Sequence, residues 1–111
     1  MSKRIRRTKQ LRQDLIDVYR YIHERNPRAA EKVFDAIERN IKSLLETPGV
    51  GHRWESSDPR LEGMRVAVVT PYRNYLIFFR ASPKGVDVYR LIHGARELGE
   101  IMDEIDVEFE R

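Results

Sequence analysis

Apolar side chains recur every three or four residues in two segments near the N-terminus, as on one face of an amphipathic helix. In the first segment, Thr8 is a candidate N-cap, and the helix is expected to end near Arg25. Its apolar stripe consists of Leu11, Leu15, Val18, Tyr19 and Ile22. In the second segment, Asn26 is the candidate N-cap, Pro27 takes the first helical position, and the helix stops before Pro48. Its stripe consists of Ala30, Val33, Phe34, Ile37, Ile41, Leu44 and Leu45. The very short connection between the two stripes predicts an antiparallel helical hairpin.

Three strand candidates follow the two helices. Residues 64–69 are rich in β-branched side chains, and Thr70-Pro71 ends them. Residues 75–81 are apolar on both faces, which predicts a central strand. Residues 86–93 alternate, so that Val86, Val88, Arg90 and Ile92 should share one face while Asp87, Tyr89, Leu91 and His93 share the other. Because the connections are short, we expect an antiparallel meander.

Three further segments complete the expected order. Ile5 lies in a short basic stretch that predicts a first strand at a sheet edge, where arginine and lysine discourage unwanted pairing. Residues 48–63 form the longest irregular segment, and the apolar positions within 98–105 suggest a short third helix after Gly94. The order β-α-α-β-β-β predicts an α+β fold, a two-layer domain in which the helical hairpin packs on an antiparallel sheet.

Size and composition narrow the class of protein. A length of 111 residues fits one domain, 1–111. The chain has no cysteine, which excludes disulfides, zinc–thiolate sites and thiol nucleophiles and favours a reducing cytoplasm. We expect no signal peptide, because no apolar run follows the basic N-terminus, and no membrane span, because the apolar run 75–79 is far too short.

Charge is distributed unevenly along the chain. Residues 1–95 hold 19 Lys and Arg against 11 Asp and Glu, whereas the acidic C-terminal tail, 96–111, holds 2 against 7. The basic body suits a polyanion or an acidic protein partner, and the tail could either fold back on the body or weaken the binding of anions. Ordinary solvated charge is the alternative.

Five short motifs occur together in the order and spacing of a known bacterial family. They are the helical segment 14–22, the helix start Asn-Pro-Arg-Ala-Ala at 26–30, the helix exit at 44–51, Arg65 with the strand segment 71–79, and Arg-Leu-Ile-His-Gly-Ala-Arg at 90–96. Each motif alone is weak, but together they resemble the ParE/RelE toxin superfamily of type II toxin–antitoxin systems, and its ParE branch in particular. The resemblance extends from about Leu11 to Arg96.

The resemblance implies both a protein partner and a toxic activity. The partner is a small cognate antitoxin that wraps and neutralises the toxin, in a heterotetramer or a larger assembly. ParE-type toxins act on DNA gyrase, so the favoured expectation from the resemblance is a non-catalytic gyrase inhibitor without cofactors. RelE-type toxins instead cut mRNA on the ribosome, and a third reading is a toxin fold that serves only as a binding module.

The candidate nuclease residues are Arg73, His93 and Arg96. RNA cleavage without a metal needs groups that transfer protons and groups that stabilise the added charge on phosphorus. The resemblance places Arg73 and Arg96 where RelE-type toxins have two such arginines, but the tyrosine expected next is replaced by Met102, which cannot donate a proton. His93 could act as an acid or base, or it could simply end a strand beside the Gly94 turn. The favoured interpretation therefore assigns no catalytic residue.

The candidate binding residues are arginines on predicted strands and one tyrosine beside them. They are Arg65, Tyr72, Arg73, Arg80 and Arg90. Arginine fits a sheet core poorly, so we expect these side chains to face solvent or a partner and to form a basic concave face for an acidic antitoxin segment or another target. The alternative is solvation at the sheet edge with pairing to Asp87 or Glu62. The antitoxin is expected to lay an apolar segment across the helical hairpin or along a sheet edge.

Other kinds of site find no support in the sequence. His23, His52 and His93 are far apart and have no metal-ligand spacing, so no metal site is expected. Gly49 and Gly51 follow a helix, whereas a phosphate-binding glycine loop follows a strand.

Overall fold

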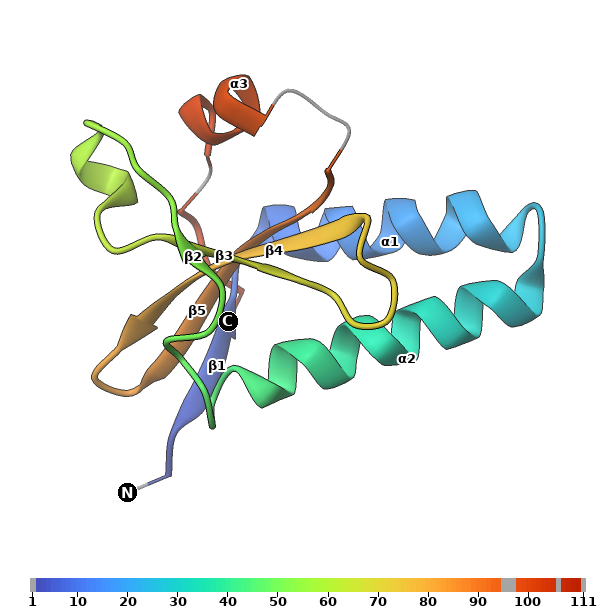
Figure 1. Cartoon of the computed structure of the whole chain (residues 1–111). Coiled ribbons are helices and arrows are strands. Elements are labelled where there is room, and N and C mark those ends of the chain that lie inside the picture. Colours follow the sequence, from blue (N-terminus) through green and yellow to red (C-terminus); the bar gives the residue numbers. More distant parts are fainter. Residues whose placement is uncertain (1, 95–97, 106, 111) are drawn as a thin grey trace.

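The computed structural model describes residues 2–94, 98–105 and 107–110 and contains the elements in the predicted order (Figure 1). The strands are β1 (Arg4–Arg7), β2 (His52–Arg53), β3 (Arg65–Val68), β4 (Tyr75–Ser82) and β5 (Gly85–His93). The helices are α1 (Lys9–His23), α2 (Pro27–Ser43) and α3 (Leu98–Asp103), with a short 3-10 helix, η1, at Pro59–Leu61. The α+β fold is confirmed, and the segment predicted to be irregular gains β2 and η1.

Both predicted N-caps are confirmed. The hydroxyl oxygen of Thr8 accepts a hydrogen bond from the backbone N–H of Leu11 at 3.0 Å. The same buried hydroxyl donates to the carbonyl of Tyr89 at 2.7 Å, which ties the start of α1 to β5. The side chain of Asn26 accepts from the backbone N–H of Ala29 at 3.1 Å, and Pro27 takes the first helical position. The turn between the helices is therefore specified locally.

The sheet has five strands in the order β1-β5-β4-β3-β2. The meander β3-β4-β5 is antiparallel as predicted, and β4 lies at the centre. β1 lies at an edge, also as predicted, but it runs parallel to β5, so the complete sheet is mixed. The parallel pairing is possible because the hairpin of α1 and α2 and the meander separate β1 from β5 in the chain.

A β-bulge in β5 makes the predicted face assignment wrong. Phe79 lies opposite Val88 and Phe78 lies opposite Arg90, so Tyr89 is an extra residue in the pairing. An inserted residue reverses the alternation of side chains beyond it. The side chains that pack toward the helices are therefore Val86, Val88 and Leu91, whereas Tyr89 and Ile92 pack on the other face.

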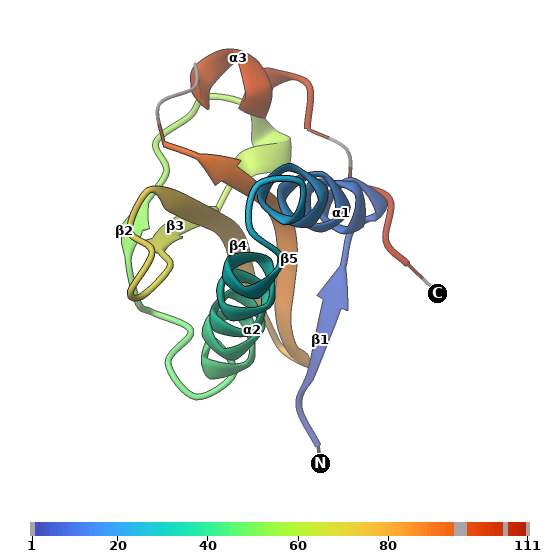
Figure 2. The same cartoon turned by 90° about the vertical axis from the view of Figure 1, so that its right-hand side faces the viewer.

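Each face of the sheet carries an apolar cluster. The helix-side cluster joins α1 and α2 to the sheet, and Figure 2 looks along these two helices where they lie side by side. Its buried members include Leu11, Ile37, Ile41, Ile77, Phe79 and Val88. The smaller outer cluster packs the 3-10 turn and α3 against the other face, through Leu61, Met64, Phe78, Tyr89, Ile92, Met102 and Ile105. The predicted third helix is thus part of the packed fold.

The acidic C-terminal tail folds back on the body where it is described. Residue Phe109 forms an isolated antiparallel bridge with Thr8, next to the start of α1. In the described part of the chain, no helix combines the length and apolarity needed to cross a membrane.

Candidate partner-binding groove

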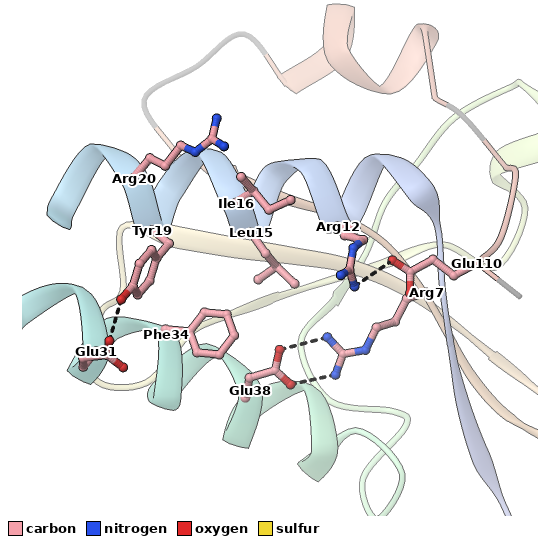
Figure 3. A pocket seen from close by; sticks show the side chains of 10 residues that line it. All are labelled: Arg7, Arg12, Leu15, Ile16, Tyr19, Arg20, Glu31, Phe34, Glu38 and Glu110. Carbon is pink, nitrogen blue, oxygen red and sulfur yellow. Dashed lines mark hydrogen bonds and ion pairs between the residues drawn. The ribbon is translucent and has the colours of Figure 1, made fainter. Parts of the chain in front are cut away.

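A groove with a volume of about 670 Å³ runs between α1 and α2 on the side of β1 (Figure 3). Its apolar lining consists of Leu15, Ile16, Tyr19 and Phe34. Its charged lining consists of Arg7, Arg12, Arg20, Glu31, Glu38 and Glu110. The two sets are arranged as an apolar floor with charged side chains around it, which is the usual form of a protein-binding groove.

The floor exists because the apolar arc of α1 is wider than the sheet can cover. Leu15 is buried against the helix-side cluster, but Ile16 and Tyr19 are only half-buried on the flank of the helix. Phe34 of α2 is also half-buried, and its ring meets that of Tyr19 edge to face with centroids 6.0 Å apart. The two stripes therefore leave part of their apolar surface open to a partner.

A tyrosine–glutamate hydrogen bond joins the two helices across the groove. The phenol of Tyr19 donates to the carboxylate of Glu31, as Figure 3 shows. This hydrogen bond raises the pKa of Tyr19 above its usual value of 10.0. The hydrogen bond therefore links α1 to α2 at this end of the groove.

Two ion pairs lie at the opposite end of the groove from Tyr19 and Glu31. The guanidinium of Arg7 on β1 makes two hydrogen bonds to the carboxylate of Glu38 on α2, at 3.0 and 2.7 Å. Arg12 contacts Glu110 at 3.5 Å near the same end. Arg20 is exposed on the rim, and its side chain has no hydrogen-bond partner among the described residues. An amphipathic segment with apolar anchors and acidic flanks fits this lining.

The predicted binding arginines do not meet at one concave face, and three of them are engaged inside the molecule. Arg65 on β3 donates to the carbonyls of Gly49 at 2.7 Å, Val50 at 3.1 Å and Gly51 at 3.1 Å. Gly51 has a φ of +78°, and a Cβ there would lie 2.1 Å from the carbonyl oxygen of Val66. Arg65 therefore holds a loop whose backbone passes tightly along β3.

Arg80 on β4 holds a second loop. Its guanidinium donates to the carbonyls of Arg60 at 3.2 Å and Glu62 at 3.0 Å. It also donates to the phenol oxygen of Tyr89 at 2.6 Å. Tyr89 is fully buried, and burial raises the pKa of its phenol. Arg80 thus contacts the backbone carbonyl of Glu62, and no ion pair between an arginine and the Glu62 carboxylate is seen among the described residues.

Arg90 on β5 is largely buried, so the expectation that it faces solvent or a partner is wrong. Its guanidinium forms hydrogen bonds of 2.8 and 3.0 Å with both carboxylate oxygens of Asp14 on α1. The backbone N–H of Leu91 donates to the same carboxylate at 3.0 Å. Side-chain exposures of 12% and 8% make this a buried ion pair between helix and sheet. Asp87 pairs instead with Arg6 of β1, at 2.8 Å.

Tyr72 and Arg73 lie in the turn between β3 and β4. The side chain of Asn40 on α2 accepts from the backbone N–H of Thr70 at 3.1 Å and donates to its carbonyl at 3.0 Å, which fixes the start of this turn. Tyr72 is half-buried against the helix-side cluster. The side chain of Arg73 is exposed and has no hydrogen-bond partner in the described part of the chain.

His93, the candidate acid or base, lies at the end of β5. Its ring meets that of Tyr75 edge to face at 5.4 Å, and burial raises the pKa of the Tyr75 phenol. These two side chains line a shallow pocket of about 500 Å³ with Asp17, Val18 and Tyr21. Arg96 lies outside the described residues. Of the two candidate nuclease arginines, the structure therefore describes only Arg73.

The family model that matches this chain is described as the ParE toxin of the type II toxin–antitoxin system parDE, and it matches residues 5–98. The chain belongs to the ParE toxin family. The match covers β1, both long helices and the whole meander, so the ParE-like motifs and the fold point to the same family.

A solved structure supports the fold of this ParE-family chain. A chain of the chromosomal ParDE toxin–antitoxin system from P. aeruginosa superposes with a TM-score of 0.67 at 21% sequence identity. The superposition covers 82% of this chain and 95% of that chain. A search among curated proteins finds no match.

Two findings bear on chemistry in this ParE-family protein. Met102, which stands where the RelE-type pattern would have a tyrosine, is fully buried in the outer cluster. Within the described ranges, no three His, Asp or Glu side chains gather as a metal site would require.

The sequence predicts an antitoxin segment across the helical hairpin but does not locate the groove, because Tyr19 and Phe34 count as core positions and Ile16 lies outside the predicted stripe. The signal that would have found it is the adjacent pair Leu15-Ile16, which widens the apolar arc of α1 beyond one core-facing stripe.

Proposed function

We propose that this ParE-family toxin inhibits DNA gyrase without catalysing a reaction, and that a cognate antitoxin neutralises it by binding in the groove between α1 and α2. The single observation that carries the proposal is the family match over residues 5–98. The cytoplasm, where gyrase works, is the expected site of action, and a heterotetramer or a larger toxin–antitoxin complex is the expected stored form.

The groove supports the antitoxin part of the proposal. Its half-buried floor of Ile16, Tyr19 and Phe34 offers apolar area to a partner, and Arg20 offers a charge on the rim. An antitoxin helix would place apolar side chains at a spacing of three and four residues along such a floor. Because Arg65, Arg80 and Arg90 already hold loops and a helix, they are weaker candidates for direct contacts than the rim of the groove.

Arg73 and Tyr72 support the target part. Arg73 is exposed beside the half-buried ring of Tyr72, and an arginine next to an aromatic ring is typical of residues that anchor protein interfaces. We infer that this turn contacts the target, while the groove contacts the antitoxin. The two surfaces involve different elements, so variants can separate them.

The test uses purified gyrase with relaxed and supercoiled plasmid. Excess toxin should block supercoiling and trap gyrase–DNA cleavage complexes, which appear as linear DNA after detergent and protease treatment. An equimolar amount of antitoxin should abolish both effects. Unimpaired supercoiling at stoichiometric excess of folded toxin would contradict the gyrase assignment.

The same preparation distinguishes the alternatives. Primer extension on translated mRNA would reveal cuts in the ribosomal A site, and cuts that disappear in an Arg73→Ala, Arg96→Ala variant would favour the RelE-like activity. Cells that grow normally while they overproduce the chain without antitoxin would favour a binding module.

A further inference from the structure

Residues 107–110, called the strap here, lie beside the end of β1 and the start of α1. The backbone N–H of Lys9 donates to the carbonyl of Glu108 at 2.9 Å. The backbone N–H of Glu110 donates to the carbonyl of Arg7 at 2.7 Å. With the antiparallel bridge between Thr8 and Phe109, these bonds continue the sheet by a short additional strand.

The side chains of the strap alternate between apolar and acidic, and the last three, at positions 108–110, each meet a complementary group. Glu108 pairs with Lys9 at 2.7 Å, and Glu110 pairs with Arg12 at 3.5 Å, as Figure 3 shows for the second pair. Between them, the ring of Phe109 lies 4.0 Å from the guanidinium carbon of Arg6, measured to the ring centroid. Both the backbone groups and the side chains of the strap thus find partners on β1 and α1.

The surface that it occupies is unusually basic for a sheet edge. β1 has the sequence Arg-Ile-Arg-Arg and pairs with β5 on one side, and in the part of the chain that the structure describes its other side is met only by the strap, at Arg7. Two copies of such an edge would repel each other. An extended segment with acidic side chains can instead pair with the backbone and meet Lys9 and Arg12, because Arg6 and Arg7 are already paired with Asp87 and Glu38.

We propose that residues 6–9 together with Arg12, the basic edge, form a docking site for an acidic extended segment of a protein partner, and that the strap is its internal occupant in the free chain. The proposal rests on the proposed function only for the partner's identity, which would be the antitoxin. Glu110 also lines the groove. A partner segment that leaves the groove at this end therefore reaches the basic edge by replacing the strap.

The strap is held in a way that permits replacement. The side chains of Lys9 and Glu108 are 58% and 64% exposed, so their attraction is screened by water and salt. Arg12 is 69% exposed. The only apolar anchor is Phe109, which lies at the margin of the outer cluster beside Tyr89, with ring centroids 5.6 Å apart.

A protein segment fits these contacts better than a nucleic acid. The strap uses a backbone N–H and a backbone carbonyl at alternate positions, which is the pattern of a β-strand. A phosphate backbone offers acceptors for Arg6 and Arg7 but no donor for the Arg7 carbonyl.

The experiment uses the full chain and a fluorescein-labelled synthetic peptide with the sequence of residues 104–110. The released variant carries Glu108→Gln, Phe109→Ala and Glu110→Gln. Its matched control carries Glu100→Gln and Glu104→Gln. These substitutions also remove two negative charges, but from exposed positions in α3 and just after it. Circular dichroism and thermal melting establish that each variant is folded before the peptide is titrated by fluorescence anisotropy.

The released variant should bind the peptide roughly tenfold or more tightly than the wild type, because an internal occupant competes at a high effective concentration. The control variant should behave as the wild type, and a peptide with both strap glutamates replaced by glutamine should bind more weakly.

Equal binding to the wild type and a folded released variant would overturn the proposal. Displacement of the peptide by a short single-stranded RNA at equal concentration would overturn the choice of a protein partner. Neither result depends on gyrase or antitoxin, so failure here is distinct from failure of the proposed function.

Discussion

The arginines of the sheet and the arginines of α1 differ in what their guanidinium groups contact. On β3, β4 and β5, Arg65, Arg80 and Arg90 bond to loop carbonyls and to the carboxylate of a helix. On α1, Arg20 stands exposed at the rim of the groove, and Arg12 has only a 3.5 Å contact with Glu110. The sheet arginines stabilise the toxin fold, whereas the helix arginines remain available to a partner.

This difference reverses the expectation from the sequence. Arginine on a strand suggests a solvent-facing or binding residue, because its charge is costly to bury. A carboxylate with matching geometry removes that cost, and α1 supplies Asp14 for Arg90. Position on an element is therefore a weaker guide to the role of an arginine than the acceptors that the fold brings to it.

The largest effect is expected at Arg90. Arg90→Ala leaves the Asp14 carboxylate buried without its partner, which should lower the free energy of unfolding by about 3–5 kcal/mol. Urea denaturation measures the loss. A double Asp14→Ala, Arg90→Ala variant should recover part of it, and a loss below about 1 kcal/mol in the single variant would contradict a structural role for this pair.

A smaller loss of stability is expected at Arg65. Arg65→Ala removes donors from three loop carbonyls, and hydrogen bonds to charged groups are worth about 1.5–3 kcal/mol. The control is Arg53→Ala, an exposed arginine on the neighbouring β2, which should change the free energy of unfolding by about 0.5 kcal/mol or less. Equal stability of the two variants would show that Arg65 does not hold the loop.

Charge reversal at the groove should act on binding and spare stability. Arg20→Glu should weaken antitoxin binding about fivefold, or about 1 kcal/mol, mainly through slower association at low salt. Surface plasmon resonance at two salt concentrations measures this change. Arg28→Glu, exposed at the start of α2 and outside the groove lining, is the matched control. If Arg20→Glu and Arg28→Glu weakened antitoxin binding equally, the cause would be the change in net charge and not a local contact at Arg20.

The smallest effect concerns pH and Tyr89. Because burial raises the folded-state pKa of this phenol above 10.0, the unfolded chain loses its proton first as the pH rises. The contribution of Tyr89 is thus complete below about pH 10 and is lost as the pH rises through the folded-state pKa. Tyr89→Phe should flatten the decline in stability above pH 10, measured by urea denaturation at several pH values. An unchanged slope would contradict the pKa shift.

Much of the fold follows from local sequence signals. Thr8 and the Asn26-Pro27 pair specify the starts of both long helices, and the central position of β4 follows from its apolar character on both faces. The bulge at Tyr89 could not be predicted, because nothing in the alternating residues 85–93 marks an inserted position. One inserted residue was enough to exchange the predicted faces of Leu91 and Ile92.

The site was harder to predict than the fold for a physical reason. The Arg90–Asp14 pair and the strap contacts join residues that are distant in the sequence, 76 positions apart in the first case. Local patterns carry no information about such encounters. The apolar floor of the groove was visible only as excess width of the α1 stripe, which a core-facing helix also tolerates.

The central claim is that the groove between α1 and α2 binds the antitoxin, and isothermal titration with the purified cognate antitoxin tests it most directly. Ile16→Asp places a charge on the half-buried floor, whereas Val50→Asp places one on an exposed loop apart from the groove. We expect Ile16→Asp to weaken binding on the order of a hundredfold and Val50→Asp to leave it unchanged. Wild-type affinity in a folded Ile16→Asp variant would contradict the claim.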